Sequence, residues 1–134
     1  ENQVSIQLAV VEAWKLYAMG KAEEALAAMR AAAEAEEKTE KHPVTPGPII
    51  PARELLGDML AAAGNFKEAM GAYERSMAVE PNRFRGYAGA AKAAARAGDK
   101  VKAEQYYRRL LELATNGDGE RPVLKQARAF LGMQ

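Results

Sequence analysis

Apolar residues recur along this chain at helical spacing, in stretches that are separated by glycine and proline. Alanine dominates the apolar content, and long runs of β-branched residues are missing. Because alanine is the best helix former, the pattern predicts an all-α fold. In the first stretch the apolar positions are Val4, Leu8, Val11, Leu16 and Met19. The predicted helices cover residues 4–19, 22–37, 51–63, 66–79, 83–97, 100–114 and 121–131.

Residues with strong turn and capping preferences lie at the boundaries of these stretches. We expect left-handed glycines to end three of the helices, at Gly20, Gly64 and Gly98. Polar side chains are predicted to cap three helices: Asn65, with Glu68 completing a capping box, Asn82 and Asp99. Pro51 is expected to be the first residue of the third helix. Within each predicted pair only about two residues separate the two helices, and a connection this short predicts that they run antiparallel.

Part of the chain repeats itself at a period of 34 residues. The matched pairs are Gly64 and Gly98, Ala69 and Ala103, and Tyr73 and Tyr107. An earlier copy of the pattern is present at Gly20, Ala25 and Met29, displaced by ten further residues. A unit of this size cannot bury its apolar face alone, so the period predicts a stacked array of helix pairs.

The ten extra residues coincide with a proline-rich insert at 42–50. Each proline removes a backbone donor and restricts the residue before it, so this segment is predicted to be non-helical. Two interpretations stay open: an ordered lid over the concave face of the array, or a spacer loop that kinks it. The apolar residues Val44, Ile49 and Ile50 slightly favour ordered packing.

The repeated unit resembles the tetratricopeptide repeat (TPR). The positions that carry the resemblance are Leu56, Gly57, Leu60, Gly64, Phe66, Ala69, Tyr73 and Pro81. The resemblance implies a right-handed superhelical α-solenoid of antiparallel helix pairs, in one domain that spans residues 1–134. Its parts are a degenerate repeat at 1–41, the insert at 42–50, repeats at 51–82 and 83–115, and a capping helix at 120–132. Residues 40–60 also resemble the C-terminal region of uncharacterised bacterial TPR proteins.

In TPR arrays the first helix of each unit lines a concave groove that binds a partner. The resemblance therefore implies a set of candidate partner-binding residues: Trp14, Tyr17, Glu54, Asp58, Arg85, Lys92 and Arg96. The set has an aromatic end, an acidic middle and a basic end, which would complement a segment with an apolar anchor and an acidic group. Two alternatives stay open: Trp14 packs on the insert or on a preceding repeat, and the basic trio is simply solvated.

One known TPR binding mode is not expected. Some TPR arrays grip the carboxyl tail of chaperones through lysine, asparagine and arginine at set groove positions. Here the corresponding positions hold Val10, Trp14, Leu55 and Gly89, so we do not expect this chain to bind a chaperone tail in that way.

Charge and composition exclude several function classes. The net charge of +1 gives no reason to expect nucleic acid or a membrane as a partner, although residues 83–134 alone carry eleven Lys or Arg against five Asp or Glu. No 18-residue apolar run predicts a membrane-spanning helix. The chain has no cysteine, and its single histidine, His42, lies in the insert, so neither a metal site nor a cofactor is expected. No nucleophile or phosphate-loop motif is present, and we expect no catalytic residues.

The sequence thus predicts a non-catalytic scaffold that binds a protein or peptide partner. The alternative is a structural segment at the end of a longer TPR array, which either packs on upstream repeats or forms a homodimer. The chain begins Glu1-Asn2-Gln3, which suggests a fragment from which any signal peptide would be missing. The compartment is therefore not predicted.

Overall fold

The computed structural model describes residues 3–39, 50–114 and 121–133 of the chain. Every regular element in these ranges is an α-helix, as predicted. The helices are α1 (Gln3–Ala18), α2 (Ala22–Thr39), α3 (Ala52–Ala62), α4 (Phe66–Val79), α5 (Phe84–Ala97), α6 (Lys100–Leu113) and α7 (Pro122–Phe130).

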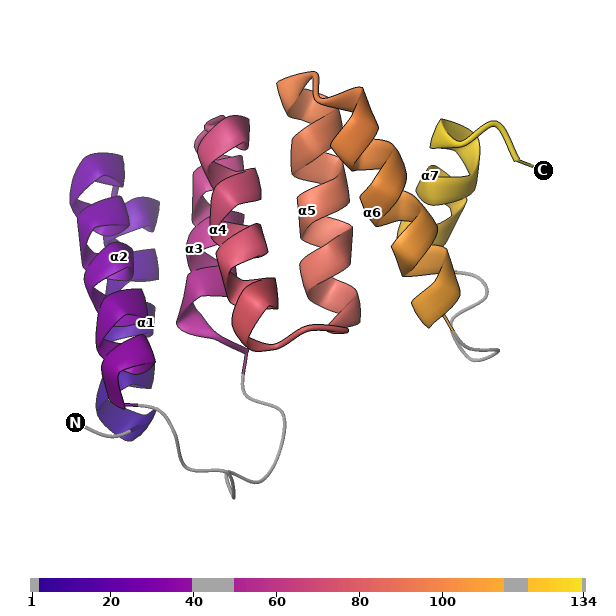
Figure 1. The fold of residues 1–134 in the computed structure, drawn as a ribbon. Coiled ribbons are helices and arrows are strands. Elements are labelled where there is room, and N and C mark those ends of the chain that lie inside the picture. The colour runs from indigo at the N-terminus through magenta and orange to yellow at the C-terminus, as the bar shows by residue number, and fades with distance from the viewer. Residues whose placement is uncertain (1–2, 40–49, 115–120, 134) are drawn as a thin grey trace.

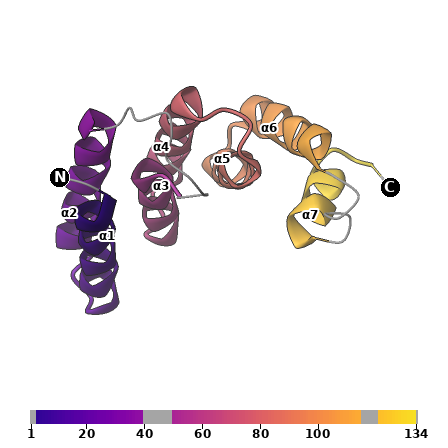
Figure 2. The ribbon, with the colours of Figure 1, turned by 90° about the horizontal axis from the view of Figure 1, so that it is seen from below.

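The helices stack in chain order into a solenoid, with α1 and α2 at one end and α7 at the other (Figure 1). Seen from below, they follow an arc in which α3, α5 and α7 lie on the inner side and α4 and α6 on the outer side (Figure 2). Each helix packs mainly on the helices before and after it in sequence. The arrangement is the α-solenoid that the 34-residue period predicts.

Three glycines end helices in the left-handed conformation, as predicted. Gly20, Gly64 and Gly98 have φ values of 84°, 88° and 87°. After each of them the next backbone N–H turns back to a helix carbonyl: from Lys21 to Leu16 at 3.0 Å, from Asn65 to Leu60 at 2.8 Å and from Asp99 to Ala94 at 2.9 Å. These bonds satisfy carbonyls that the helix end would otherwise leave without a partner.

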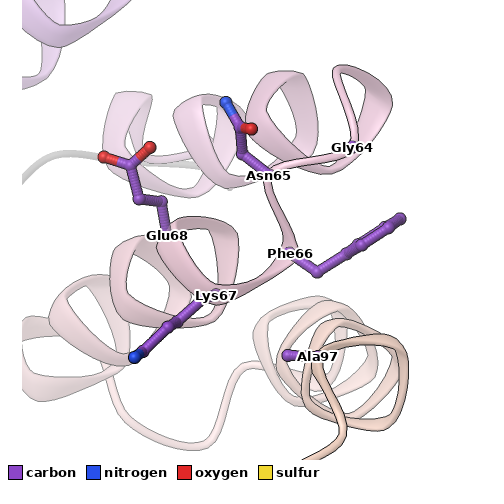
Figure 3. A pocket seen from close by; sticks show the side chains of 6 residues that line it. All are labelled: Gly64, Asn65, Phe66, Lys67, Glu68 and Ala97. Carbon is purple, nitrogen blue, oxygen red and sulfur yellow. The ribbon is translucent and has the colours of Figure 1, made fainter.

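Of the three predicted polar caps, only Asp99 forms. Its carboxylate accepts a hydrogen bond from the Lys102 N–H at 3.1 Å. Asn65 occupies the N-cap position of α4, as predicted, but its side chain makes no cap bond and points away from α4 (Figure 3), while Glu68 pairs with Arg30 on α2 at 3.3 Å. A tertiary ion pair has thus replaced the local capping box.

The predicted helix starts at Asn82 and Pro51 also need correction. The position before α5 is Arg83, whereas Asn82 adopts a left-handed φ of 72° and its side-chain oxygen accepts from Arg109 at 2.6 Å. Pro51 lies one residue before α3 rather than within it. In both cases the helix begins one residue later than predicted.

Small residues allow the helices to approach closely. Ala69, Ala91 and Ala103 are fully buried. The ring of Tyr73 on α4 lies between two glycines, Gly57 on α3 and Gly89 on α5. This large side chain fills the space that the missing Cβ atoms leave at the helix crossings.

Most of the apolar positions that mark the first helix in the sequence lie on the exposed face of α1. Val4, Leu8, Val11 and Met19 are exposed, at 65%, 64%, 53% and 64%, whereas Ile6 and Ala13 are buried. Because α1 stands at the end of the array and packs mainly on α2, only one of its two apolar faces is covered. Helical spacing alone could not decide which face that would be.

At the other end, α7 packs on α6. Leu124 and Ala127 are buried, and the Phe130 ring lies 5.1 Å from the ring of Tyr107.

Two segments between the predicted helices are not described by the structure. The insert apart from Ile50, and with it His42, lies outside the described residues. Residues 116–119, between the last two predicted helices, do as well.

Candidate functional site

The predicted groove residues come from three alternate helices of the array. Trp14 and Tyr17 belong to α1, Glu54 and Asp58 to α3, and Arg85, Lys92 and Arg96 to α5. Helices α3 and α5 lie on the inner side of the arc (Figure 2). Whether a partner touches these residues stays a prediction, but their environments differ and limit what each can do.

The aromatic end consists of two rings in contact. Trp14 and Tyr17 meet edge to face, with centroids 5.6 Å apart and planes at 65°. Both are half-buried and pack against the main core, so they are held in place and still expose part of their surface. Rigid, partly exposed aromatic side chains of this kind are typical anchors for an apolar side chain of a partner.

The acidic middle is different from the sequence prediction, because Glu54 is completely buried. Its carboxylate accepts hydrogen bonds from two arginines at the start of α5, from Arg83 Nε at 2.9 Å and from Arg85 Nη1 at 2.6 Å. A carboxylate without solvent exposure and with both oxygens engaged cannot contact a ligand. Glu54 therefore joins α3 to α5 and is not a binding residue.

Asp58 has a similar role one helical turn later. The hydroxyl of Tyr73 donates to one carboxylate oxygen at 2.5 Å, and Arg85 Nη2 donates to the other at 2.6 Å. Burial and the hydrogen bond to the Asp58 carboxylate raise the pKa of Tyr73 far above its ordinary value. Burial alone would lower the pKa of Arg85, but its hydrogen bonds to Glu54 and Asp58 outweigh that effect and raise it.

The four charged groups of this network balance, since two carboxylates face two guanidinium groups. The other charged groove positions of α5 are both positive. Lys92 is exposed and has no side-chain partner within the described ranges. Arg96 is also exposed, and its guanidinium carbon lies 4.5 Å from the centroid of the Phe66 ring. The uncompensated charge of the site is therefore cationic rather than mixed.

A shallow hollow lies beside this basic end, where the α3–α4 turn meets the end of α5 (Figure 3). It is lined by Gly64, Asn65, Phe66, Lys67, Glu68 and Ala97. The hollow is open and carries one cation and one anion, so it has no feature that selects a ligand. We assign it no binding role of its own.

Two residues of the site were missed at the sequence level. Arg83 falls outside the groove register, and Tyr73 was considered only as a position of the repeat pattern. A signal for the arginines was present, because Glu54 and Arg85 are separated by 31 residues. This is close to the repeat period and brings the first turns of neighbouring units together.

No metal-ligand cluster of three or more His, Asp or Glu residues occurs within the described parts of the chain. None of the helices described there is long and apolar enough to cross a bilayer.

Comparison with known proteins identifies the fold. No family model matches the sequence, and no curated protein matches it either. Among solved structures, the type III secretion chaperone SycD of Yersinia enterocolitica, in complex with a peptide of the translocator YopD, superposes with a TM-score of 0.76. The identity is 18%, over 98% of this chain and 92% of that one.

Two further structures give similar superpositions. PcrH, in complex with the chaperone binding region of PopB, has a TM-score of 0.70 at 17% identity over 97% of both chains. The first TPR of Spaghetti (RPAP3), bound to the HSP90 peptide SRMEEVD, has a TM-score of 0.73 at 16% identity over 98% of this chain and 94% of that one. At this level of identity the likeness establishes the fold alone: the chain has a TPR-like helical-repeat fold.

Proposed function

We propose that this protein is a non-catalytic scaffold whose concave face, formed by α1, α3 and α5, binds a peptide segment of a partner protein. The fold supports this proposal, since the three solved structures of the same fold are described with bound peptides or binding regions of other proteins. The first helices of three units, α1, α3 and α5, would together offer a surface long enough for an extended or helical segment.

The partner segment carries acidic residues at one end and an apolar side chain at the other. The observation that carries this proposal is the positive charge on α5, where Lys92 and Arg96 are exposed while the nearby carboxylates of α3 are already paired. An acidic group would meet these two cations. The apolar anchor would meet Trp14 and Tyr17, which lie toward the other end of the array.

The chaperone-tail grip is not part of the proposal. At one of the positions that this grip uses, Gly89 lies against the ring of Tyr73, and an added Cβ would stand 2.5 Å from ring atoms. A longer side chain at this position could not enter the groove. The HSP90 peptide of the RPAP3 structure is therefore not the ligand that we propose here.

The proposal is tested with a designed set of fluorescent peptides. Each peptide places an acidic pair and a leucine or phenylalanine anchor at a different separation, and matched peptides carry lysines in place of the acidic pair. Anisotropy titrations should show binding of acidic peptides at one preferred separation. The affinity should fall as salt is added, because the peptide's acidic pair would meet Lys92 and Arg96 at an exposed surface, where salt screens the attraction.

Variants localise the binding. Lys92→Glu combined with Arg96→Glu should weaken binding of the best acidic peptide by about tenfold or more. The control, Lys100→Glu with Arg108→Glu, makes the same charge change on exposed positions of the outer helix α6 and should leave the affinity within about twofold. Arg85 is left unchanged because it pairs with buried Glu54. Equal losses in the two double variants, or binding of only the lysine peptides, would refute the assignment.

A further inference from the structure

The two ends of the array are finished differently. At the C-terminal end, α7 carries Lys125 and Arg128 at the positions where α5, 34 residues earlier, carries the buried Ala91 and Ala94. These charges keep the outer surface of α7 polar, as the last helix of a solenoid requires. The N-terminal end also carries charges at positions that other units bury, but there the charges lie among exposed apolar residues.

One face of α1 combines exposed apolar residues with two opposite charges. We call this face the outer stripe. Its residues recur at helical spacing within about one quarter to one third of the helix circumference: Val4, Leu8, Val11, Glu12, Lys15 and, just past the helix end, Met19. All six are exposed.

The repeat register indicates that the middle of the outer stripe is a stacking surface. Gly20 aligns with Gly64, so Leu8, Glu12 and Lys15 align with Ala52, Leu56 and Met59 of α3. Those three α3 residues are at most 2% exposed. The next unit gives the same result, since Ala90 and Ala93 of α5, which align with Leu56 and Met59, are also at most 2% exposed.

The charges of the outer stripe specify what can cover it. Neither Glu12 nor Lys15 has a side-chain partner in residues 3–39, 50–114 or 121–133. A helix pair of the ordinary kind would bury both charges without compensation, which is costly. A suitable cover must supply a cation opposite Glu12 and an anion opposite Lys15. A second copy of the chain does both by symmetry, because a two-fold contact is self-complementary.

We propose that a second copy of this chain docks on the outer stripe, so that the two α1 helices run antiparallel across a two-fold axis. Glu12 of each copy then faces Lys15 of the other. The same antiparallel register sets Leu8 opposite Met19, and both of these side chains are exposed in the single chain. The contact thus pairs charge with charge and apolar surface with apolar surface.

The geometry also indicates the strength of this dimer. A helix of 16 residues is about 24 Å long, so one helix–helix contact lies at the small end of specific interfaces. We expect a weak dimer whose population depends on concentration. The outer stripe lies at the end of the array, so the dimer leaves the inner side of α3 and α5 open. The proposal is therefore independent of the peptide-binding function.

Charge exchange provides the test. Light scattering over a concentration series should show the parent rising from 14.5 kDa toward twice that mass. Glu12→Lys alone and Lys15→Glu alone should each raise the dimer dissociation constant by about tenfold or more, because each variant opposes like charges. The double variant Glu12→Lys/Lys15→Glu should restore the dimer, as should an equimolar mixture of the two single variants.

Lys100→Glu on α6 is the matched control, and it should dimerise like the parent; circular dichroism melts show whether each variant is folded. A parent that stays at the monomer mass throughout, or single reversals without effect, would overturn the proposal. Loss of the dimer in Lys100→Glu to the same extent would overturn it as well. So would a folded double variant that does not recover the dimer, since the pairing of Glu12 with Lys15 would then be wrong.

Discussion

Gly89 on α5 lies directly against the ring of Tyr73 on α4, so closely that a Cβ at position 89 would stand 2.5 Å from two ring atoms. The ring cannot move away from position 89, because other contacts hold it on its far side. Gly57 lies on its other side, where an added Cβ would be 2.8 Å away, and its hydroxyl is bonded to Asp58 at 2.5 Å. Three helices therefore meet at one tyrosine, and the close approach requires glycine at both contact points.

Gly89→Ala should lower the free energy of unfolding by about 1–3 kcal/mol through overpacking, although alanine is the better helix former. Gly71→Ala on α4 is the matched control, because nothing lies within 4 Å of a Cβ built there. The control should gain about 0.5–1 kcal/mol from helix propensity alone. Urea denaturation of both variants measures the difference, and a Gly89→Ala variant that gains stability would contradict the packing described here.

Glu54→Gln should destabilise the fold by about 2–3 kcal/mol, because it removes the charge from a buried acceptor of two arginine hydrogen bonds. The control is Glu112→Gln on α6, where the carboxylate is exposed and bonds Arg109 within the same helix. That change should cost no more than about 0.5 kcal/mol. Thermal melts at neutral pH compare the two, and similar small losses would show that the Glu54 network contributes little to stability.

Acid should weaken the contact between α2 and α3 through Glu37. Its carboxylate accepts from Arg53 at 2.9 Å and 2.8 Å and from Arg75 at 3.0 Å. The hydrogen bond to Arg53 is the largest cause that lowers the pKa of Glu37 below 4.5. A lowered pKa in the folded state means stability that is present above about pH 4.5 and is lost as the pH falls through the folded-state value.

Replacement of the carboxylate tests this pH dependence. Glu37→Gln should be less stable than the parent at neutral pH and should lose less stability between neutral pH and about pH 3. Glu34→Gln, at an exposed position of the same helix, should keep the acid dependence of the parent. Denaturant titrations across that pH range measure both slopes. Identical slopes for Glu37→Gln and the parent would rule out the Glu37 contribution.

Alkali should act through Tyr73 in the opposite direction. Burial, followed by the hydrogen bond to Asp58, raises its pKa well above the ordinary value of 10.0. Only the unfolded chain then ionises this tyrosine above about pH 10, so the stability that is complete below that pH falls as the pH rises further.

Tyr73→Phe removes the ionisable group and keeps the ring. The variant should lose about 1 kcal/mol at neutral pH, because Asp58 loses one donor. It should also lose stability less steeply than the parent above about pH 10. Denaturant titrations at neutral and alkaline pH provide the comparison. An unchanged alkaline slope would mean that Tyr73 ionises equally well in the folded protein.

The candidate site was only partly predictable from the sequence. The periodic register placed Arg85, Lys92 and Arg96 together on the helix α5. It did not show that Glu54 accepts hydrogen bonds from two arginines, because this pairing depends on how the first turns of α3 and α5 face each other. Exposure was equally undetermined: Lys92 and Glu54 are both charged groove positions, yet one is solvated and the other has no exposed surface.

The sequence by itself determined the helices, the left-handed glycines between them and the solenoid order, because these depend on local backbone preferences and on a repeated apolar pattern. The tertiary structure alone decided which of the two apolar faces of α1 is buried and which carboxylates remain free to bind a partner. Both depend on the neighbour that each face meets. A helix at the end of an array lacks one neighbour, and its spacing of apolar residues is the same on either side.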